Sequence, residues 1–209
     1  MVLAGGHGQR FGAPKQFALL GDRPLLDWSL DAARGVAHEV VLVLPEHELS
    51  RNVPRPGVVV VAGGATRAAS VRAGLDAVPE DAEVVVIHDA ARPLATPALF
   101  RHVVEVLLDE EHPVDGVIPA LRVTDTVKKV VDDRVISTIP REDLVAVQTP
   151  QAFRASVLRH AHASAGEATD DAALLEEIGA TVGIVPGETT NLKVTTPSDL
   201  VVAAILAAR

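Results

Sequence analysis

Short hydrophobic runs recur along the chain, separated by longer stretches in which polar and apolar residues alternate with helical spacing. Valine and leucine dominate these runs, and we expect strands at Val2–Ala4, Val40–Leu44, Val58–Ala62, Val84–His88, Gly116–Pro119 and Leu144–Val147. Near-continuous β-branched runs are typical of strands that are buried on both faces of a parallel sheet. The pattern therefore predicts a sheet that is covered by helices on each side.

Helical periodicity fills the intervals between these strands. The spacing predicts helices at Leu25–Arg34, Arg67–Ala77, Pro97–Glu110 and Phe153–Ala163. A last helix should begin at Thr196, because a threonine N-cap is followed by Pro197 at the first helical position and by Asp199 at the third. Strand–helix alternation at this spacing predicts one α/β domain over residues 1–209, with a doubly wound, mostly parallel, Rossmann-like sheet flanked by helices.

Residues 122–141 interrupt this alternation. Two short polar–apolar runs lie on either side of Val131-Asp132-Asp133-Arg134, which is a hairpin signal. The segment is interpreted as an inserted β-hairpin arm that reaches away from the sheet, or as a surface decoration. The pattern alone leaves both interpretations open.

Composition and charge exclude several classes of function. The net charge is −9 and aromatic residues make up 2%, so neither backbone neutralisation nor base stacking supports nucleic-acid binding. The absence of cysteine excludes disulfides, thiolate metal sites and a cysteine nucleophile. No apolar run approaches the roughly 18 residues that span a bilayer, and no secretory signal is recognised at the N-terminus. We expect a cytoplasmic protein that does not bind membranes.

A glycine-rich loop follows the first strand directly, from Ala4 to Lys15. Glycines allow main-chain N–H groups to approach a phosphate, and Arg10 and Lys15 add positive charge. A dinucleotide site would need an acidic residue about 20 positions further on, and a P-loop would need Ser or Thr after the lysine, where Gln16 stands. A triphosphate-binding loop of another kind remains, beside the alternative of a tight turn with solvated cations.

Three more segments hold candidate residues: two follow strand ends, and the third is a turn before the last helix, where a lone lysine is usually just solvated. Asp89 could hold Mg²⁺ and Arg92 could bind a phosphate, or the two could form a local ion pair. The Gly63-to-Ser70 segment offers free N–H groups at a helix start, and Lys193 lies on a glycine-flanked turn. His88 is interpreted as a packed strand residue, not as a base. No nucleophile elbow or zinc-ligand spacing is found, so glycine and cations at strand ends favour phosphoryl chemistry.

Seven motifs in order resemble the 2-C-methyl-D-erythritol 4-phosphate cytidylyltransferase family. They read AGGHGQRFGAPKQF, GGATRAAS, VVIHDAARP, TDTVKKV, QTPQAF, TDDAALLEE and NLKVTTPSDL, and they run from residue 4 to about residue 200. The resemblance implies a homodimeric, Mg²⁺-dependent nucleotidyltransferase of isoprenoid precursor synthesis. Such an enzyme transfers CMP from CTP to methylerythritol phosphate and releases pyrophosphate.

The resemblance also implies a role for individual residues. Arg10, Lys15 and Lys193 would be catalytic and would stabilise charge at the α-phosphate of CTP. The nucleotide would be bound by Ala4, Gly5, Gly6, Gly8, Gly64 and Ser70. The methylerythritol phosphate would be bound by Asp89, Arg92, Thr126, Arg141, Thr149 and Thr169. Asp89 would also bind the metal, and the arm would embrace a second subunit so that Thr126 and Arg141 complete the site across a dimer.

Two departures from the family pattern keep other functions open. The first turn reads Ala4-Gly5-Gly6 where the family usually has Ala-Ala-Gly, and Ala65 stands where an acidic residue often follows the two glycines. The alternatives are ribitol-5-phosphate cytidylyltransferase, a non-catalytic nucleotide-binding paralogue, and a guanylyltransferase of molybdenum-cofactor type that shares only the first loop. The Thr124–Lys128 motif and the TDD motif favour the methylerythritol enzyme.

Overall fold

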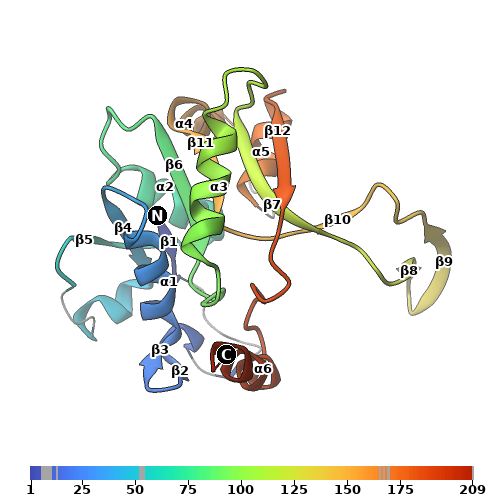
Figure 1. The fold of residues 1–209 in the computed structure, drawn as a ribbon, viewed down its shortest axis with the longest axis horizontal. Helices are drawn as coiled ribbons and strands as arrows, with labels where there is room; N and C mark the ends of the chain where they lie inside the picture. The colour runs from blue at the N-terminus through green and yellow to red at the C-terminus, as the bar shows by residue number, and fades with distance from the viewer. Residues whose placement is uncertain are drawn as a thin grey trace.

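The computed structural model describes residues 1–5, 11–12, 14–51, 55–164, 166, 168 and 170–208, with only the backbone at residue 51. Within these residues the chain forms an eight-stranded central sheet, shown in Figure 1. Four parallel strands make up one half of it: β5 (Val58–Ala62), β4 (Val40–Leu44), β1 (Val2–Leu3) and β6 (Val84–Asp89). The other half contains β11 (Gln151–Arg154), β10 (Val145–Val147), β7 (Gly116–Arg122) and β12 (Val182–Pro186).

Only β10 and β11 run against their neighbours in the sheet. Both pair antiparallel with β7, and β11 also pairs antiparallel with β6, whereas β12 is parallel to β7. The register changes between them, because Val147 faces Ala120 and Ala152 faces Val117. Residues 148–150 therefore form an irregular step between β10 and β11, directly beside the carboxyl end of β6.

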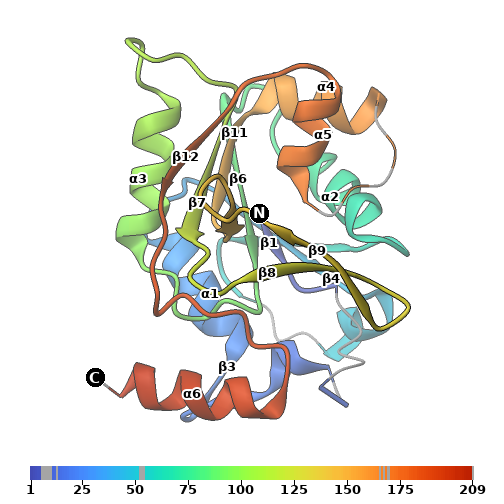
Figure 2. The same cartoon turned by 90° about the vertical axis from the view of Figure 1, so that its right-hand side faces the viewer.

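Helices cover both faces of the sheet, as Figure 2 shows. One face carries α1 (Leu25–Arg34) and α3 (Pro97–Leu107), whose Leu30 and Phe100 pack with Leu42 of β4. The other carries α2 (Arg67–Leu75), α4 (Ala155–Ser164) and α5 (Asp171–Glu177), where Val71, Leu158 and Leu174 pack with Ile87 of β6. The fold prediction is confirmed: a mostly parallel sheet lies between two helical layers.

The sequence predicts the β-branched strands and the helix starts well. β4, β5 and α1 have the expected bounds, and α6 (Pro197–Ala207) begins with the expected capping box, in which Thr196 and Asp199 bond each other's backbone. Other bounds were wrong: α2 ends at Leu75 and α3 at Leu107, before the predicted Ala77 and Glu110. The start of α4 was also wrong, because Phe153 belongs to β11 and α4 begins at Ala155. Phe153 is fully buried against Gly116 of the neighbouring strand, a contact that helical periodicity cannot reveal.

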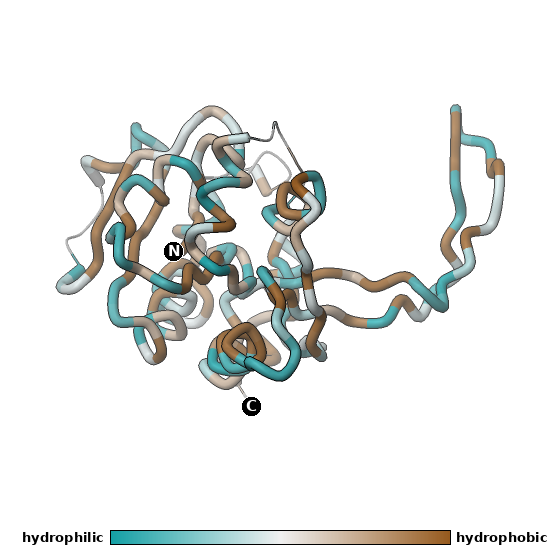
Figure 3. Tube along the Cα trace, turned by 90° about the horizontal axis from the view of Figure 1, so that it is seen from above, coloured by the Kyte–Doolittle hydropathy of each residue, from teal (hydrophilic) through white to brown (hydrophobic). Residues whose placement is uncertain are grey.

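A hairpin projects from the sheet (Figures 1 and 3). It consists of β8 (Val127–Val131) and β9 (Arg134–Ile139). Asp132 and Asp133 in its turn have positive φ angles of 47° and 60°, as the right-handed twist of a two-residue hairpin turn requires. The predicted hairpin is thus confirmed, and it extends away from the main body.

The remaining elements are short. They are the β2–β3 hairpin (Leu19–Leu20 and Arg23–Pro24), η1 (Lys15–Phe17) and η2 (Glu46–Arg51). η1 and the β2–β3 hairpin lie near α1 and α6, and η2 lies beside β5. In the part of the chain that the structure describes, no helix has the length and apolar character needed to cross a membrane.

Candidate active site

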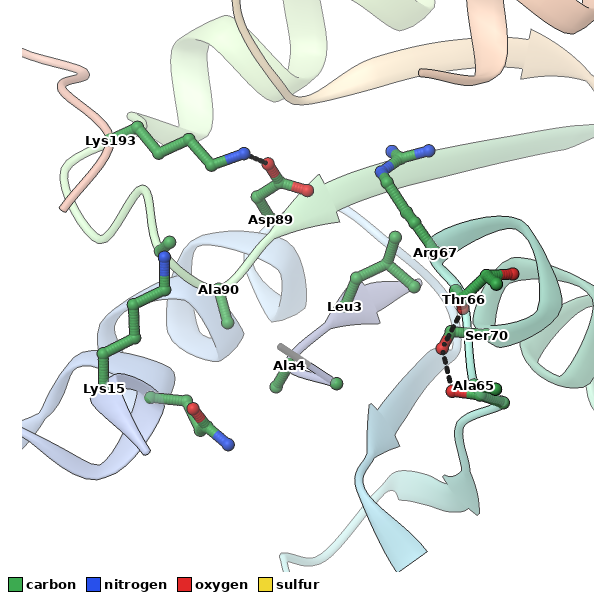
Figure 4. Close-up of a pocket in the computed structure, with 14 residues that line it drawn as sticks. Leu3, Ala4, Lys15, Ala65, Thr66, Arg67, Ser70, Asp89, Ala90 and Lys193 are labelled. Atoms are coloured by element: carbon green, nitrogen blue, oxygen red, sulfur yellow. Dashed lines mark hydrogen bonds and ion pairs between the residues drawn. The ribbon is translucent and has the colours of Figure 1, made fainter. Parts of the chain in front are cut away.

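A cavity of about 270 Å³ opens where the parallel strands end. Its walls come from four places in the fold: the end of β1 with Ala4 and Gly5, η1 with Lys15, the turn from Gly64 to Ser70, and the end of β6 with Asp89. Lys193 closes one side, as Figure 4 shows. Ligands of open α/β sheets bind beyond the carboxyl ends of the strands, so this cavity is the candidate site.

The turn between β5 and α2 forms a wall of main-chain atoms. Thr66 caps α2 by accepting the Ala69 N–H at 3.1 Å, and the Ser70 hydroxyl donates to Thr66 O at 2.9 Å and contacts Gly64 O at 3.3 Å. A Cβ atom on Gly64 would lie 2.4 Å from the Ala69 Cβ. Glycine is therefore required for this close packing, which leaves the backbone of the turn facing the cavity.

Opposite this wall, Asp89 forms an ion pair with Lys193, with 2.6 Å between Oδ2 and Nζ. Burial alone would raise the pKa of Asp89, but the charges of Lys193 and Arg67 outweigh it and lower that pKa. Asp89 is therefore a carboxylate at neutral pH. The Lys15 ammonium donates to Val194 O at 3.0 Å, so Lys15 contacts the segment that carries Lys193.

The local ion pair between Asp89 and Arg92 is not formed. The Arg92 guanidinium donates instead to Asn191 O at 2.8 Å and to Val147 O at 3.2 Å. Burial lowers the pKa of Arg92 despite the nearby charge of Asp89. Arg92 thus joins the end of β6 to the segment that carries Lys193.

His88 is fully buried on β6, as the sequence predicts for a packed strand residue. Its Nε2 lies 3.1 Å from Arg92 O, and its Nδ1 lies 3.1 Å from the Thr149 hydroxyl oxygen. Burial lowers the pKa of His88 to about 4, despite the opposing effect of Asp89. The ring is therefore neutral at physiological pH and does not serve as a proton carrier there.

Sequence reasoning missed a buried charge cluster behind the cavity. Arg67 lines the cavity and donates from Nη2 to Asp171 Oδ2 at 2.7 Å. Asp171 is completely buried, and its other oxygen lies 3.0 Å from His162 Nε2. Burial alone would lower the pKa of Arg67, but the Asp171 carboxylate raises it. Arg67 lies within the GGATRAAS motif and Asp171 within the TDDAALLEE motif, and these are the local signals that could have drawn attention to the cluster.

Part of the predicted set gathers in the cavity and part lies elsewhere. Ala4, Gly5, Lys15, Gly64, Ser70, Asp89 and Lys193 line it. Thr149 is 5% exposed and lies behind Asp89, whereas the exposed residues Thr126 and Arg141 lie at the base of the arm. Arg141 donates to Thr124 O. The predicted positions Gly6, Gly8, Arg10 and Thr169 lie outside the described residues.

Comparisons with known proteins identify the family of the whole chain. The family model described as 2-C-methyl-D-erythritol 4-phosphate cytidylyltransferase matches residues 1–209. Enzymes with that name from Rhodococcus jostii (strain RHA1) and Rhodococcus opacus (strain B4) are 47% and 46% identical, each over 99% of this chain and 93% of the relative. The crystal structure of the Thermus thermophilus enzyme has a TM-score of 0.84 at 37% identity and covers 100% of this chain and 98% of that one.

Proposed function

Since the chain belongs to the 2-C-methyl-D-erythritol 4-phosphate cytidylyltransferase family, we propose that the cavity around Asp89 is where it carries out that reaction. The protein is a nucleotidyltransferase that transfers the cytidylyl group of CTP to methylerythritol phosphate and releases pyrophosphate. The observation that carries the proposal for the site is the cavity at the strand ends, which has Lys15 and Lys193 on one wall and the turn from Gly64 to Ser70 on the other.

The two walls suit the two ends of a nucleotide. The turn from Gly64 to Ser70 lines the cavity, and backbone groups of such a turn can bind a cytosine and a ribose. Lys15 and Lys193 lie on the opposite wall and can bind phosphate oxygens through charge-assisted hydrogen bonds. CTP would then lie across the cavity, with its α-phosphate close to both ammonium groups and to Asp89.

The reaction needs no covalent intermediate on the protein. An oxygen of the acceptor phosphate attacks the α-phosphorus of CTP, a new P–O bond forms, and the bond between the α-phosphorus and the bridging oxygen breaks. Pyrophosphate leaves with that electron pair. Lys15 and Lys193 would stabilise the negative charge that grows on the transferred group, and Arg10 is proposed for the same role on the family resemblance.

The Asp89 carboxylate suits a magnesium ion that the phosphates of the nucleotide would also bind. Among the described residues, Asp89 is the carboxylate that lines the cavity, and no cluster of three or more histidine or acidic side chains could hold an ion alone. Mg²⁺ is commonly bound by one or two carboxylates together with substrate phosphates and water. A bound ion would neutralise phosphate charge, and Asp89 would hold it at the cavity.

We also propose that the arm forms a homodimer. Val130, Val131, Val135 and Ile136 are 49–62% exposed on β8 and β9, a density of apolar surface that favours contact with another chain. Thr126 and Arg141 lie at the base of the arm and not among the residues that line the cavity. If these two residues bind the acceptor, they therefore do so in the cavity of a partner subunit.

Pyrophosphate release tests the function directly. The purified protein is assayed with Mg²⁺ and CTP, with methylerythritol phosphate or ribitol 5-phosphate as acceptor and with ATP and GTP as controls. We expect release only with CTP and methylerythritol phosphate. Release with ribitol 5-phosphate alone would show that the protein is a ribitol-5-phosphate cytidylyltransferase. CTP binding without turnover would indicate a non-catalytic paralogue.

Variants test the site and the arm separately. Lys15→Ala should lower turnover at least about 100-fold, the order of magnitude lost with one transition-state donor, while Arg101→Ala on the exposed side of α3 should keep normal turnover. Unchanged turnover in Lys15→Ala would refute the role of that lysine.

Ile136→Asp should shift the sedimentation of the protein from dimer to monomer. If the wild-type protein itself sediments as a monomer, the proposed dimer is refuted.

A further inference from the structure

The two ring nitrogens of His88 have fixed partners, and these partners determine where the proton lies. Nε2 faces Arg92 O at 3.1 Å, and a carbonyl oxygen can only accept a hydrogen bond. Nε2 must therefore carry the hydrogen. In the neutral ring Nδ1 is then an acceptor, so the Thr149 hydroxyl donates to it across 3.1 Å.

The same hydroxyl oxygen accepts a hydrogen bond from the backbone of Asp89. The distance from Asp89 N to Thr149 Oγ1 is 3.0 Å. The bonds thus form a directed chain, in which Asp89 N–H donates to Thr149, Thr149 O–H donates to His88, and His88 Nε2–H donates to Arg92 O. Thr149 holds the first residue of the Asp89–Arg92 turn, and His88 holds the last.

A second set of contacts joins this turn to the segment that carries Lys193. Asn191 Nδ2 donates to Thr149 O at 2.9 Å, and Arg92 Nη1 donates to Asn191 O at 2.8 Å. Asn191 and His88 are completely buried, so water cannot replace these bonds. The positions of Asp89 and Lys193, whose ion pair lies in the cavity, therefore depend on one internal network.

We propose that His88 and Thr149 are positioning residues that hold the Asp89–Arg92 turn, and that Thr149 acts on the substrates through Asp89 without contacting them. The proposal rests on the proposed site around Asp89, and it assigns Thr149 a different role from the acceptor contact that the family resemblance implies. The hydroxyl hydrogen is already donated to His88 and the oxygen already accepts the Asp89 N–H.

Substitutions at Thr149 separate positioning from general structural support. Thr149→Val keeps the shape of the side chain but removes the hydroxyl, and we expect kcat/KM for the acceptor to fall roughly 10- to 100-fold, as for other groups that orient a ligand-binding side chain. The Kd for CTP, whose base and ribose wall is the Gly64–Ser70 turn, should change less than about two-fold. Thr149→Ser retains the hydroxyl and should recover most of the activity.

His88 offers a matched pair of variants. His88→Asn keeps an acceptor near the position of Nδ1 and should retain part of the activity, whereas His88→Leu removes both polar atoms and should lose as much as Thr149→Val. In the double variant His88→Leu/Thr149→Val the losses should not multiply, because both changes break the same chain. Losses that multiply would overturn the proposal.

The tautomer is measured in the free protein, without substrates. With ¹⁵N-labelled histidine, NMR at neutral pH should show His88 as the neutral Nε2–H form, and an Nδ1–H form would overturn the proposal. Equal losses of CTP affinity and of turnover in Thr149→Val would also overturn it, since they would indicate a merely structural effect. A wild-type protein that shows the expected tautomer but no turnover with any pair of substrates would refute the proposed function and not the hydrogen-bond chain.

Discussion

Arg67 and Asp171 are expected to stabilise the protein as a coupled pair. Asp171 is completely buried, the Arg67 side chain is 29% exposed, and 2.7 Å separates their bonded atoms. Removing one partner of a buried ion pair typically costs about 3–5 kcal/mol, because the remaining charge is left without compensation. Since Arg67 is partly in contact with solvent, we expect about 2–3 kcal/mol for Arg67→Met.

For a chain of this length each kcal/mol lowers the Tm by roughly 2–4 °C, so the Tm of Arg67→Met should fall by about 4–12 °C. Urea unfolding at pH 7, followed through the fluorescence of Trp28, would give the free energy of unfolding. Arg101→Met is the matched control: its side chain is exposed on α3, so the change should stay within about 0.5 kcal/mol.

A double-mutant cycle decides whether the two residues act together. Asp171→Asn removes the buried charge, so the double variant Arg67→Met/Asp171→Asn no longer contains a carboxylate that has lost Arg67 and keeps only its contact with His162. We expect the double variant to be more stable than the sum of the single losses by about 2 kcal/mol. Additive losses within roughly 0.5 kcal/mol would refute the coupling and show that Arg67 stabilises the protein by packing alone.

Three further predictions concern single positions. Gly64→Ala should weaken CTP binding at least about ten-fold in calorimetry, because its Cβ would lie 2.4 Å from that of Ala69 and displace the turn. Gly166→Ala, with open space around its Cβ, should bind CTP normally. Equal CTP binding by the two variants would refute the steric argument. Burial lowers the pKa of His88 from 6.5 to about 4, so the unfolded state binds more protons between these values and the free energy of unfolding should fall by roughly 3 kcal/mol as the pH drops through that range. Urea titrations should show a weaker pH dependence in His88→Asn, and an unchanged one would contradict the assignment. Thr196→Ala removes the N-cap of α6 and should cost about 1 kcal/mol in urea unfolding, with no loss indicating that the cap is replaced by water.

Local patterns in the sequence predicted much of the fold. β4 is a fully buried run of valine and leucine, and β5 is a valine run at the edge of the sheet, where Val59 is exposed. The composition of both runs identifies them as strands, but it does not distinguish the buried strand from the edge strand. β11 was missed because Gln151–Arg154 is too short to show a period. α5 was missed because its first residue, Asp171, is charged and is buried only through its ion pairs with Arg67 and His162. Long-range pairing determines these elements, and a single sequence does not display it.

The same distinction applies to the site. Lys15 and Asp89 were expected near each other because loops at the ends of parallel strands meet at one edge of the sheet, and the family resemblance added Lys193; all three line one cavity. The ion pair between Arg67 and Asp171 joins residues 104 positions apart and depends on how α2 packs beside α5. The hydroxyl of Thr149 is directed by the antiparallel register of β11 on β6, which no local motif specifies.

The arm leaves the sheet and returns to it at neighbouring positions. Arg122 at the end of β7 is paired with Val145 at the start of β10, so residues 123–144 begin and end at one point of an existing ladder. In evolutionary terms this segment is a module that a single insertion or deletion in the gene can add or remove without altering the order of the strands. A descendant that lost it would keep the residues that line the cavity, and under the proposed function it would need another means of binding the acceptor, the role proposed for Thr126 and Arg141.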